Sequence, residues 1–216
     1  MSLIVPTVTA YDMHEYRRQI ELVSGFSKRI HIDLMDGIFA PTRSPELDKL
    51  WLPDGVKCDV HLMFQHPHLQ LNRVKKLDPH LVIIPAEASP ASVDEFVLMI
   101  KKTKIKLGIA LLPETNLHDP RIKKLIKRAD HVLIFSGHLG FHGGIADLTL
   151  LGKIPDVLTV NSSVEIGWDG GINLKNVTEL SKAGTMVLNT GAAIQGALDP
   201  LESYCALSNA VTGKKI

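Results

Sequence analysis

The chain has 216 residues, of which 45% are apolar and 22% charged, as in one globular domain and unlike a disordered or fibrous protein. Lysine and arginine exceed aspartate and glutamate by 24 − 23 = +1, so no bulk charge favours nucleic acid or a membrane surface. The apolar runs are too short to span a bilayer, no signal peptide is evident, and Cys58 and Cys205 form no CxxC motif. We therefore expect a cytoplasmic protein that binds neither nucleic acid nor a membrane.

Short apolar runs that suit β-strands recur along the chain and predict eight strands. In chain order they cover residues 3–8, 29–34, 57–62, 80–85, 106–112, 131–135, 164–168 and 186–189. Helical patterns lie between them at 13–24, 67–76, 92–102, 119–128 and 174–183. The pattern is weakest over 146–163, where Pro155 and a polar Asn-Ser-Ser run interrupt the expected sixth helix. Strands that alternate with helices predict βαβ units and a parallel sheet.

The spacing of the strands decides between two kinds of parallel sheet. The strand ends follow one another at similar intervals, and no tract of proline, serine or glycine resembles a linker. This regularity predicts a TIM (β/α)8 barrel that forms a single domain over residues 1–216, shorter than the usual barrel of about 250 residues. A doubly wound open sheet is the alternative, but its dinucleotide-binding signature GxGxxG does not follow the first strand.

Polar side chains stand at the carboxyl ends of three predicted strands, where barrels of this kind carry their active sites. His31 and Asp33 alternate with Ile32, so both point to one face of the second strand. His61 ends the third strand, and Asp169 follows the seventh. Two imidazoles and two carboxylates that meet at one barrel mouth suit a single divalent ion such as Zn²⁺, Fe²⁺ or Mn²⁺. We therefore predict a metal site at these four residues.

Small residues follow the last three predicted strands, in the segments 140–144, 170–171 and 191–192. Backbone amides at strand-to-helix turns bind anions, and barrels commonly hold phosphate after strands seven and eight. No lysine or arginine is obvious in these loops, so backbone dipoles would hold the anion. The pattern predicts a phosphorylated small-molecule ligand. The residues expected to contact it are Gly140, Phe141, His142, Gly143, Gly170, Gly171, Gly191 and Ala192.

Five motifs, in order along nearly the whole chain, resemble the ribulose-phosphate 3-epimerase family: HIDLMDGIFAP (31–41), DVHLM (59–63), GIALLPET (108–115), GFHGG (140–144) and WDGGIN (168–173). The resemblance implies a metal-dependent, homo-oligomeric enzyme of the pentose phosphate pathway. It would convert D-ribulose 5-phosphate into D-xylulose 5-phosphate by inverting C3 through an enediolate. The resemblance also implies that Asp33 and Asp169 are the catalytic acid and base. By the same resemblance, further substrate contacts come from Thr7, Met35, His61 and Met63.

The chain departs from the family pattern around the substrate and keeps the predicted metal ligands. Pro85-Ala86-Glu87 stands where the family usually has His-x-Glu, Leu112 replaces an asparagine, and Phe135 replaces a methionine. Two alternatives stay open for this reason. One is an epimerase for a hexulose phosphate such as allulose 6-phosphate, and the other is a non-catalytic protein that binds a sugar phosphate.

Overall fold

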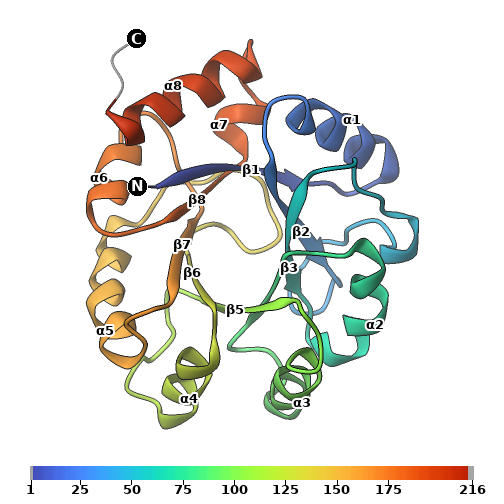
Figure 1. The fold of residues 1–216 in the computed structure, drawn as a ribbon, viewed down its shortest axis with the longest axis vertical. Coiled ribbons are helices and arrows are strands. Elements are labelled where there is room, and N and C mark those ends of the chain that lie inside the picture. The colour runs from blue at the N-terminus through green and yellow to red at the C-terminus, as the bar shows by residue number, and fades with distance from the viewer. Residues whose placement is uncertain (1, 214–216) are drawn as a thin grey trace.

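The computed structural model describes residues 2–213, in which eight parallel strands form a closed barrel in chain order (Figure 1). The strands are β1 (Leu3–Thr9), β2 (Arg29–Met35), β3 (Lys57–Met63), β4 (Leu81–Pro85), β5 (Lys106–Leu111), β6 (His131–Phe135), β7 (Glu165–Asp169) and β8 (Val187–Thr190). Pairing of β1 with β8 closes the ring. The predicted TIM barrel is confirmed, and the open sheet is excluded. The expected domain span of 1–216 extends beyond the described residues at both ends.

The helices surround the barrel (Figure 1). They are α1 (Met13–Ser24), α2 (Leu71–Val74), α3 (Pro90–Ile100), α4 (Pro120–Arg128), α5 (Lys153–Val160), α6 (Val177–Lys182), α7 (Ala192–Gln195) and α8 (Pro200–Thr212). The connection from β2 to β3 contains a 3-10 turn, Leu47–Lys49, and no α-helix, whereas two helices follow β8. Three prolines and two glycines interrupt residues 36–56 and disfavour a continuous helix there. Among the described helices, none combines the length and apolar character needed to cross a membrane.

Two helices differ from their sequence predictions. Residues 67–77 form a 3-10 turn, the short helix α2 and a second 3-10 turn instead of one continuous helix. The expected interruption by Pro155 was wrong, because this residue lies in the first turn of α5. A backbone N–H at that position has no partner inside a helix, so proline is tolerated there.

Alternate residues of each strand face either the helices or the barrel interior. On β2, Ile30, Ile32 and Leu34 belong to the large apolar core between the barrel and its helices. A separate small cluster of Leu81, Ile83, Ala110 and Leu133 lies among inward-facing positions of β4, β5 and β6. His31 and Asp33 occupy the alternate positions on β2, which directs both polar side chains inward.

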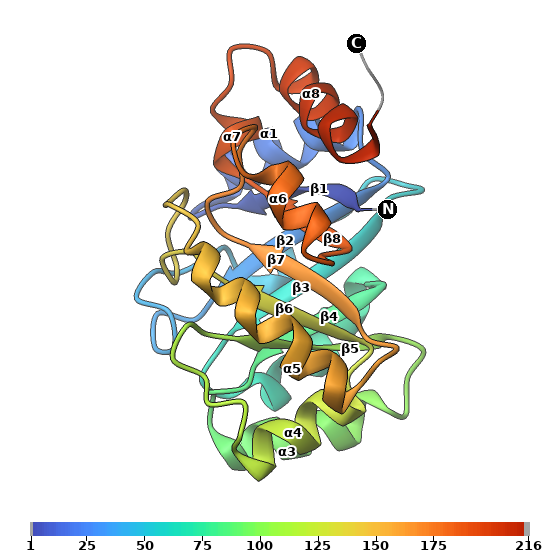
Figure 2. The same cartoon turned by 90° about the vertical axis from the view of Figure 1, so that its left-hand side faces the viewer.

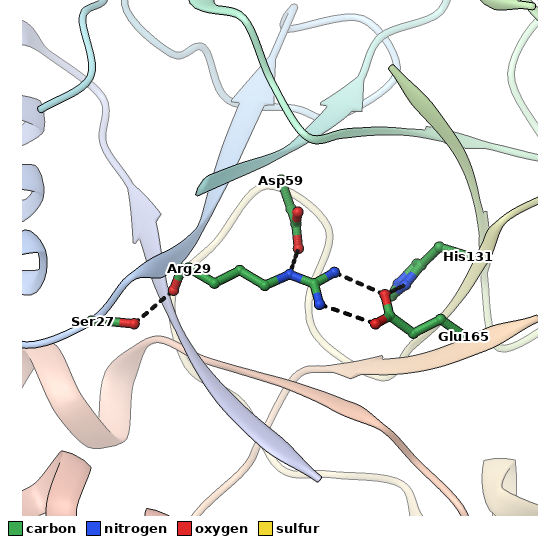
Figure 3. Close-up of polar contacts among 5 residues, drawn as sticks. All are labelled: Ser27, Arg29, Asp59, His131 and Glu165. Atoms are coloured by element: carbon green, nitrogen blue, oxygen red, sulfur yellow. Dashed lines mark hydrogen bonds and ion pairs between the residues drawn. The ribbon is translucent and has the colours of Figure 1, made fainter. Parts of the chain in front are cut away.

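An ionic network occupies the amino-terminal end of the barrel interior (Figure 3). Arg29 donates from Nε to Asp59 Oδ2 at 2.7 Å and from its two terminal nitrogens to Glu165 at 3.0 and 2.8 Å. His131 Nδ1 lies 2.9 Å from Glu165 Oε2. Gly167 leaves room for the imidazole, since a Cβ at that position would overlap the His131 ring. The candidate site lies at the opposite end of the barrel interior.

Candidate active site

Four buried side chains from three strands meet at the carboxyl end of the barrel: His31 and Asp33 of β2, His61 of β3 and Asp169 of β7. Strand register places Asp33 beside His61. Asp33 Oδ1 lies 3.2 Å from both His31 Nε2 and His61 Nδ1, and His31 Nε2 lies 3.7 Å from Asp169 Oδ2. One ligand atom of each residue lies within 4.8 Å of the other three. The structure therefore brings together all four residues that the sequence singled out.

Asp33 is held in its ionised form by its neighbours. Burial alone would raise the pKa of this carboxyl, but hydrogen bonds from His31 and His61 and the charges of these imidazoles hold the pKa well below its usual range. Thr9 adds a third hydrogen bond, from its hydroxyl to Asp33 Oδ2 at 2.7 Å. Asp33 is therefore ionised near neutral pH, which is the form that a general base requires.

The pKa of Asp169 shifts in the opposite direction, upward. Burial and the nearby charge of Asp33 raise the pKa of Asp169 to about 7, against weaker opposing effects of His31 and a backbone amide. Its Oδ2 atom is buried and has no hydrogen-bond partner among the described residues. Two carboxyls of the same chemical type therefore differ in proton affinity, because Asp33 has three side-chain donors and Asp169 has only a backbone amide.

The pKa values of the two imidazoles, His31 and His61, also shift in opposite directions. Burial lowers the pKa of His31, but its hydrogen bond to Asp33 and the surrounding carboxylates outweigh this effect and raise the pKa above its ordinary value. For His61, burial dominates and the pKa is lowered. The neutral imidazole that burial favours at His61 is also the form that binds metal ions.

A cavity of about 330 Å³ opens above these side chains. Its walls include most of the residues expected to contact a ligand: Thr7, Asp33, Met63, Gly140, Phe141, His142, Gly143, Asp169, Gly170, Gly171, Gly191 and Ala192. In the side view, the loops after β2 and β6 leave the barrel on the same side (Figure 2). Residues that are far apart in the sequence therefore line the same cavity.

Three expected site residues do not line this cavity. His31 and His61 are almost completely buried, with 0% and 1% of their surface exposed. Met35 packs with Ala40 and Met63 in a small apolar cluster, and its sulfur lies 3.0 Å from the hydroxyl oxygen of Thr42. The two imidazoles therefore contact the cavity only indirectly, through the carboxylates or a bound ion. Met35 packs against Met63 in the small apolar cluster.

Glycines bring the loops after β6 and β7 into close contact. Gly170 and Gly171 have φ angles of +111° and +69°, which side-chain-bearing residues rarely adopt. A Cβ at Gly170 would overlap the backbone of Gly137, and one at Gly171 would overlap the backbone of Ala146. The two loops can therefore approach closely only with glycine at these positions, which leaves bare backbone along the cavity wall.

The structure adds residues to the site that sequence reasoning missed. Thr9 lines the cavity beside Asp33, and its position two residues after Thr7 on the same strand could have indicated this. Asn189 is 2% exposed, and neither polar atom of its side chain has a partner among the described residues. It precedes the predicted phosphate segment 191–192 and also lines the cavity. Buried and unpaired, its amide is available to a ligand.

Sequence comparison places this arrangement among known proteins. The sequence model of the ribulose-phosphate 3-epimerase family matches residues 3–195. Ribulose-phosphate 3-epimerase of Helicobacter pylori strain J99 is 32% identical over 198 residues, which cover 88% of this chain and 89% of that protein. The enzyme of the same name from Aquifex aeolicus is 29% identical over 209 residues, covering 92% of each chain.

Solved structures show the same architecture at low identity. The crystal structure of 3-hexulose-6-phosphate synthase from Salmonella typhimurium has a TM-score of 0.71 and 15% sequence identity, and the match covers 99% of each chain. A crystal structure of 3-keto-L-gulonate-6-phosphate decarboxylase from Vibrio cholerae matches with a TM-score of 0.70 and 10% identity, over 100% of this chain and 99% of that one. At such identities the similarity concerns the fold alone.

Proposed function

This chain belongs to the ribulose-phosphate 3-epimerase family, and from that premise we propose that it inverts C3 of a phosphorylated 2-ketose, converting D-ribulose 5-phosphate into D-xylulose 5-phosphate. The protein is an isomerase of the epimerase class. The observation that carries the specific reaction is the pair Asp33 and Asp169, two carboxyls in one cavity whose pKa values move in opposite directions. A homo-oligomeric, cytoplasmic enzyme of the pentose phosphate pathway stays a prediction.

Inversion at C3 requires that one group removes a proton and a second group delivers a proton to the opposite face. Asp33, ionised by its hydrogen bonds, would accept the proton from C3. Asp169, whose raised pKa keeps part of its population protonated near neutral pH, would donate to the other face. In the reverse reaction the two residues exchange roles. Pairs of carboxyls with separated pKa values suit such acid and base roles.

A carboxylate is a weak base for this task. Its ordinary pKa of about 4 lies far below that of a C–H group beside a ketone, and each unit of mismatch costs about 1.36 kcal/mol. The enediolate that forms must therefore be stabilised within the site. Among the residues that line the cavity, Thr7, Thr9 and Asn189 carry polar side chains near the two carboxyls. We assign Thr9 the role of holding Asp33 in place, and Asn189 that of a hydrogen-bond partner for the sugar.

The donor set fits one divalent ion. Asp169 Oδ2 is buried without a hydrogen-bond partner among the described residues, and one ligand atom from each of the four residues lies within 4.8 Å of the others. Nitrogen and oxygen ligands of this kind suit Zn²⁺, Fe²⁺ or Mn²⁺. Such an ion, when bound, supplies a Lewis acid that stabilises negative charge on sugar oxygens. We propose that His31, Asp33, His61 and Asp169 hold it.

The glycine-rich segments would hold the phosphate and thereby set the position of C3. Gly143, Gly171 and Gly191 line the same cavity as the two aspartates. Bare backbone at these positions lets amides approach an anion closely. Anchoring the phosphate at one end of a small substrate fixes the distance of its reacting carbon from the acid and base, which lowers the entropic part of the barrier.

Hydrogen exchange at C3 tests this proposal directly. We expect that incubation with D-ribulose 5-phosphate in D₂O gives D-xylulose 5-phosphate with deuterium at C3, observed by NMR. Allulose 6-phosphate is the parallel substrate. Exchange only with allulose 6-phosphate would assign the enzyme to hexulose phosphates, and no exchange with either ketose phosphate in the metal-loaded protein would contradict the epimerase function.

A further inference from the structure

The charges along the cavity are unusual for a site that takes a phosphate. Its lining contains two carboxyls, Asp33 and Asp169, and no lysine or arginine among the described residues. No permanently cationic side chain in this lining is therefore available to pair with a phosphate dianion. The side chains in the lining that can become cationic are the imidazoles of His138 and His142, both on the loop after β6.

His142 lies within the glycine-rich part of this loop. Gly140, Gly143 and Gly144 around it all have positive φ angles, so the chain turns sharply on both sides of the imidazole. Gly143 lies next to α7: a Cβ at this glycine would come within 3.8 Å of Ala192 Cβ. His138 differs, because it also lines a second cavity beside Leu112 and Pro113. His142 is thus next to the glycine that approaches the predicted phosphate segment 191–192.

Two other loops hold the segment that carries His142. The hydroxyl of Thr42 donates to the carbonyl oxygen of Gly140 at 2.6 Å, and the hydroxyl of Tyr11 donates to the same oxygen at 3.3 Å. The ring of Tyr11 also contacts the His142 ring edge to face, with centroids 5.6 Å apart and planes at 88°. The imidazole is therefore placed by tertiary contacts at the rim, although it is exposed to solvent.

We propose that His142 binds the phosphate group of the substrate as an imidazolium, an inference that rests on the proposed function and assigns a specificity-determining residue to it. Histidine side chains change charge between about pH 5 and 8, so the affinity for a dianion falls as pH rises through this range. A bound dianion in turn favours the protonated imidazole, since the two binding events are linked. Backbone dipoles and one titratable charge together hold the phosphate.

Several titratable groups lie around this imidazole. Tyr11 contacts the ring, and the carboxylate of Glu15 accepts a hydrogen bond from the Tyr11 amide at 2.9 Å. Asp33 and Asp169 lie on the cavity floor, and His138 is on the same loop.

The test uses inorganic sulfate as the probe, because sulfate keeps its two charges from pH 6 to pH 8.5. Sulfate affinity of the metal-loaded protein is measured at both pH values by NMR or calorimetry. We expect His142→Gln to weaken sulfate binding at pH 6 about threefold to tenfold and to remove its pH dependence. His142→Lys keeps the charge, so its affinity should stay high at both pH values. His14→Gln, at an exposed position on α1, is the matched control and should behave like the unsubstituted protein.

Native affinity and native pH dependence in His142→Gln would overturn this inference, and so would loss of the pH dependence in His138→Gln alone. Circular dichroism of each variant shows whether the fold is kept, and the lysine variant separates the effect of charge from that of loop structure.

Turnover of D-ribulose 5-phosphate on the same samples separates the two proposals. Sulfate binding that depends on His142 in a protein without turnover supports this inference and removes the epimerase reaction. Normal turnover with an unchanged KM in His142→Gln would contradict the role of His142 and leave the proposed epimerase function in place.

Discussion

The guanidinium of Arg29 pairs with both carboxylate oxygens of Glu165, at 3.0 and 2.8 Å, although 136 residues separate the two in the chain. Arg29 begins β2 and Glu165 begins β7, so the pair spans the amino-terminal end of the barrel (Figure 3). Asp59 is 1% exposed and relies on the same guanidinium. A single cation thus neutralises two acidic groups inside the fold.

Replacing this cation should destabilise the protein strongly. Arg29→Met leaves Asp59 without its cation and Glu165 with His131 alone, and loss of one member of a buried ion pair costs about 3–5 kcal/mol. Urea unfolding followed by circular dichroism measures the free energy. The control is Lys49→Met, because Lys49 pairs with Glu46 on the surface, where the expected change is below about 1 kcal/mol. Equal stability of the two variants would contradict the role assigned to Arg29.

The two aspartates of the site should each be essential for turnover. Asp33→Asn and Asp169→Asn remove the base and the acid, and we expect each to lower kcat by about 10²–10⁴-fold. Circular dichroism should show an intact barrel in both. Asp54→Asn, at an exposed position, serves as the control. Near-normal turnover in either site variant would remove that aspartate from the acid/base pair.

The stability of the metal-free protein should depend on pH through Asp169. Because its pKa is raised to about 7, the folded state holds a proton that the unfolded state has released. Stability from this group is therefore present below about pH 4 and is lost as pH rises to about 7. At pH 8 and without metal, Asp169→Asn should be more stable than the unsubstituted protein by about 1–3 kcal/mol. Thermal unfolding in the presence of a chelator checks the sign, and a less stable variant would refute it.

Metal content should depend on the buried imidazoles. His31→Gln removes one of the four proposed ligands, and we expect the bound divalent metal per chain to fall at least about tenfold. Elemental analysis after dialysis measures the ratio. His66→Gln, at an exposed position near the start of α2, is the matched control. Unchanged metal content in the His31 variant would count against the proposed ligand set.

Thr9 should act through Asp33 as a positioning residue. Thr9→Val keeps the shape of the side chain but removes the hydrogen bond to Asp33 Oδ2, which stabilises the carboxylate. The acidic limb of the kcat/KM profile should therefore move to higher pH, and kcat should fall about tenfold. Thr9→Ser restores the hydroxyl and should restore both. A purely structural role would leave the pH profile of the valine variant unchanged.

Local patterns in the sequence predict much of this protein. Eight apolar runs mark the eight strands, and the alternation His31-Ile32-Asp33 places two polar groups on one face, since side chains along a strand alternate strictly. These features depend on neighbouring residues only. The prediction for Pro155 was wrong, because the effect of a proline depends on where the helix begins, and this boundary is set by packing against the barrel.

Only the tertiary structure decides which distant residues meet and how their chemistry differs. Register between β2 and β3 sets His61 beside Asp33, and closure of the ring brings Asp169 within reach of His31. The opposite pKa shifts of Asp33 and Asp169 follow from the donors that surround each carboxyl in space. Sequence alone therefore determined the strands and the faces of their side chains, because these depend on local periodicity. The fold decided the acid, the base and the position of His142, because electrostatic interactions depend on distance in space and not on separation along the chain.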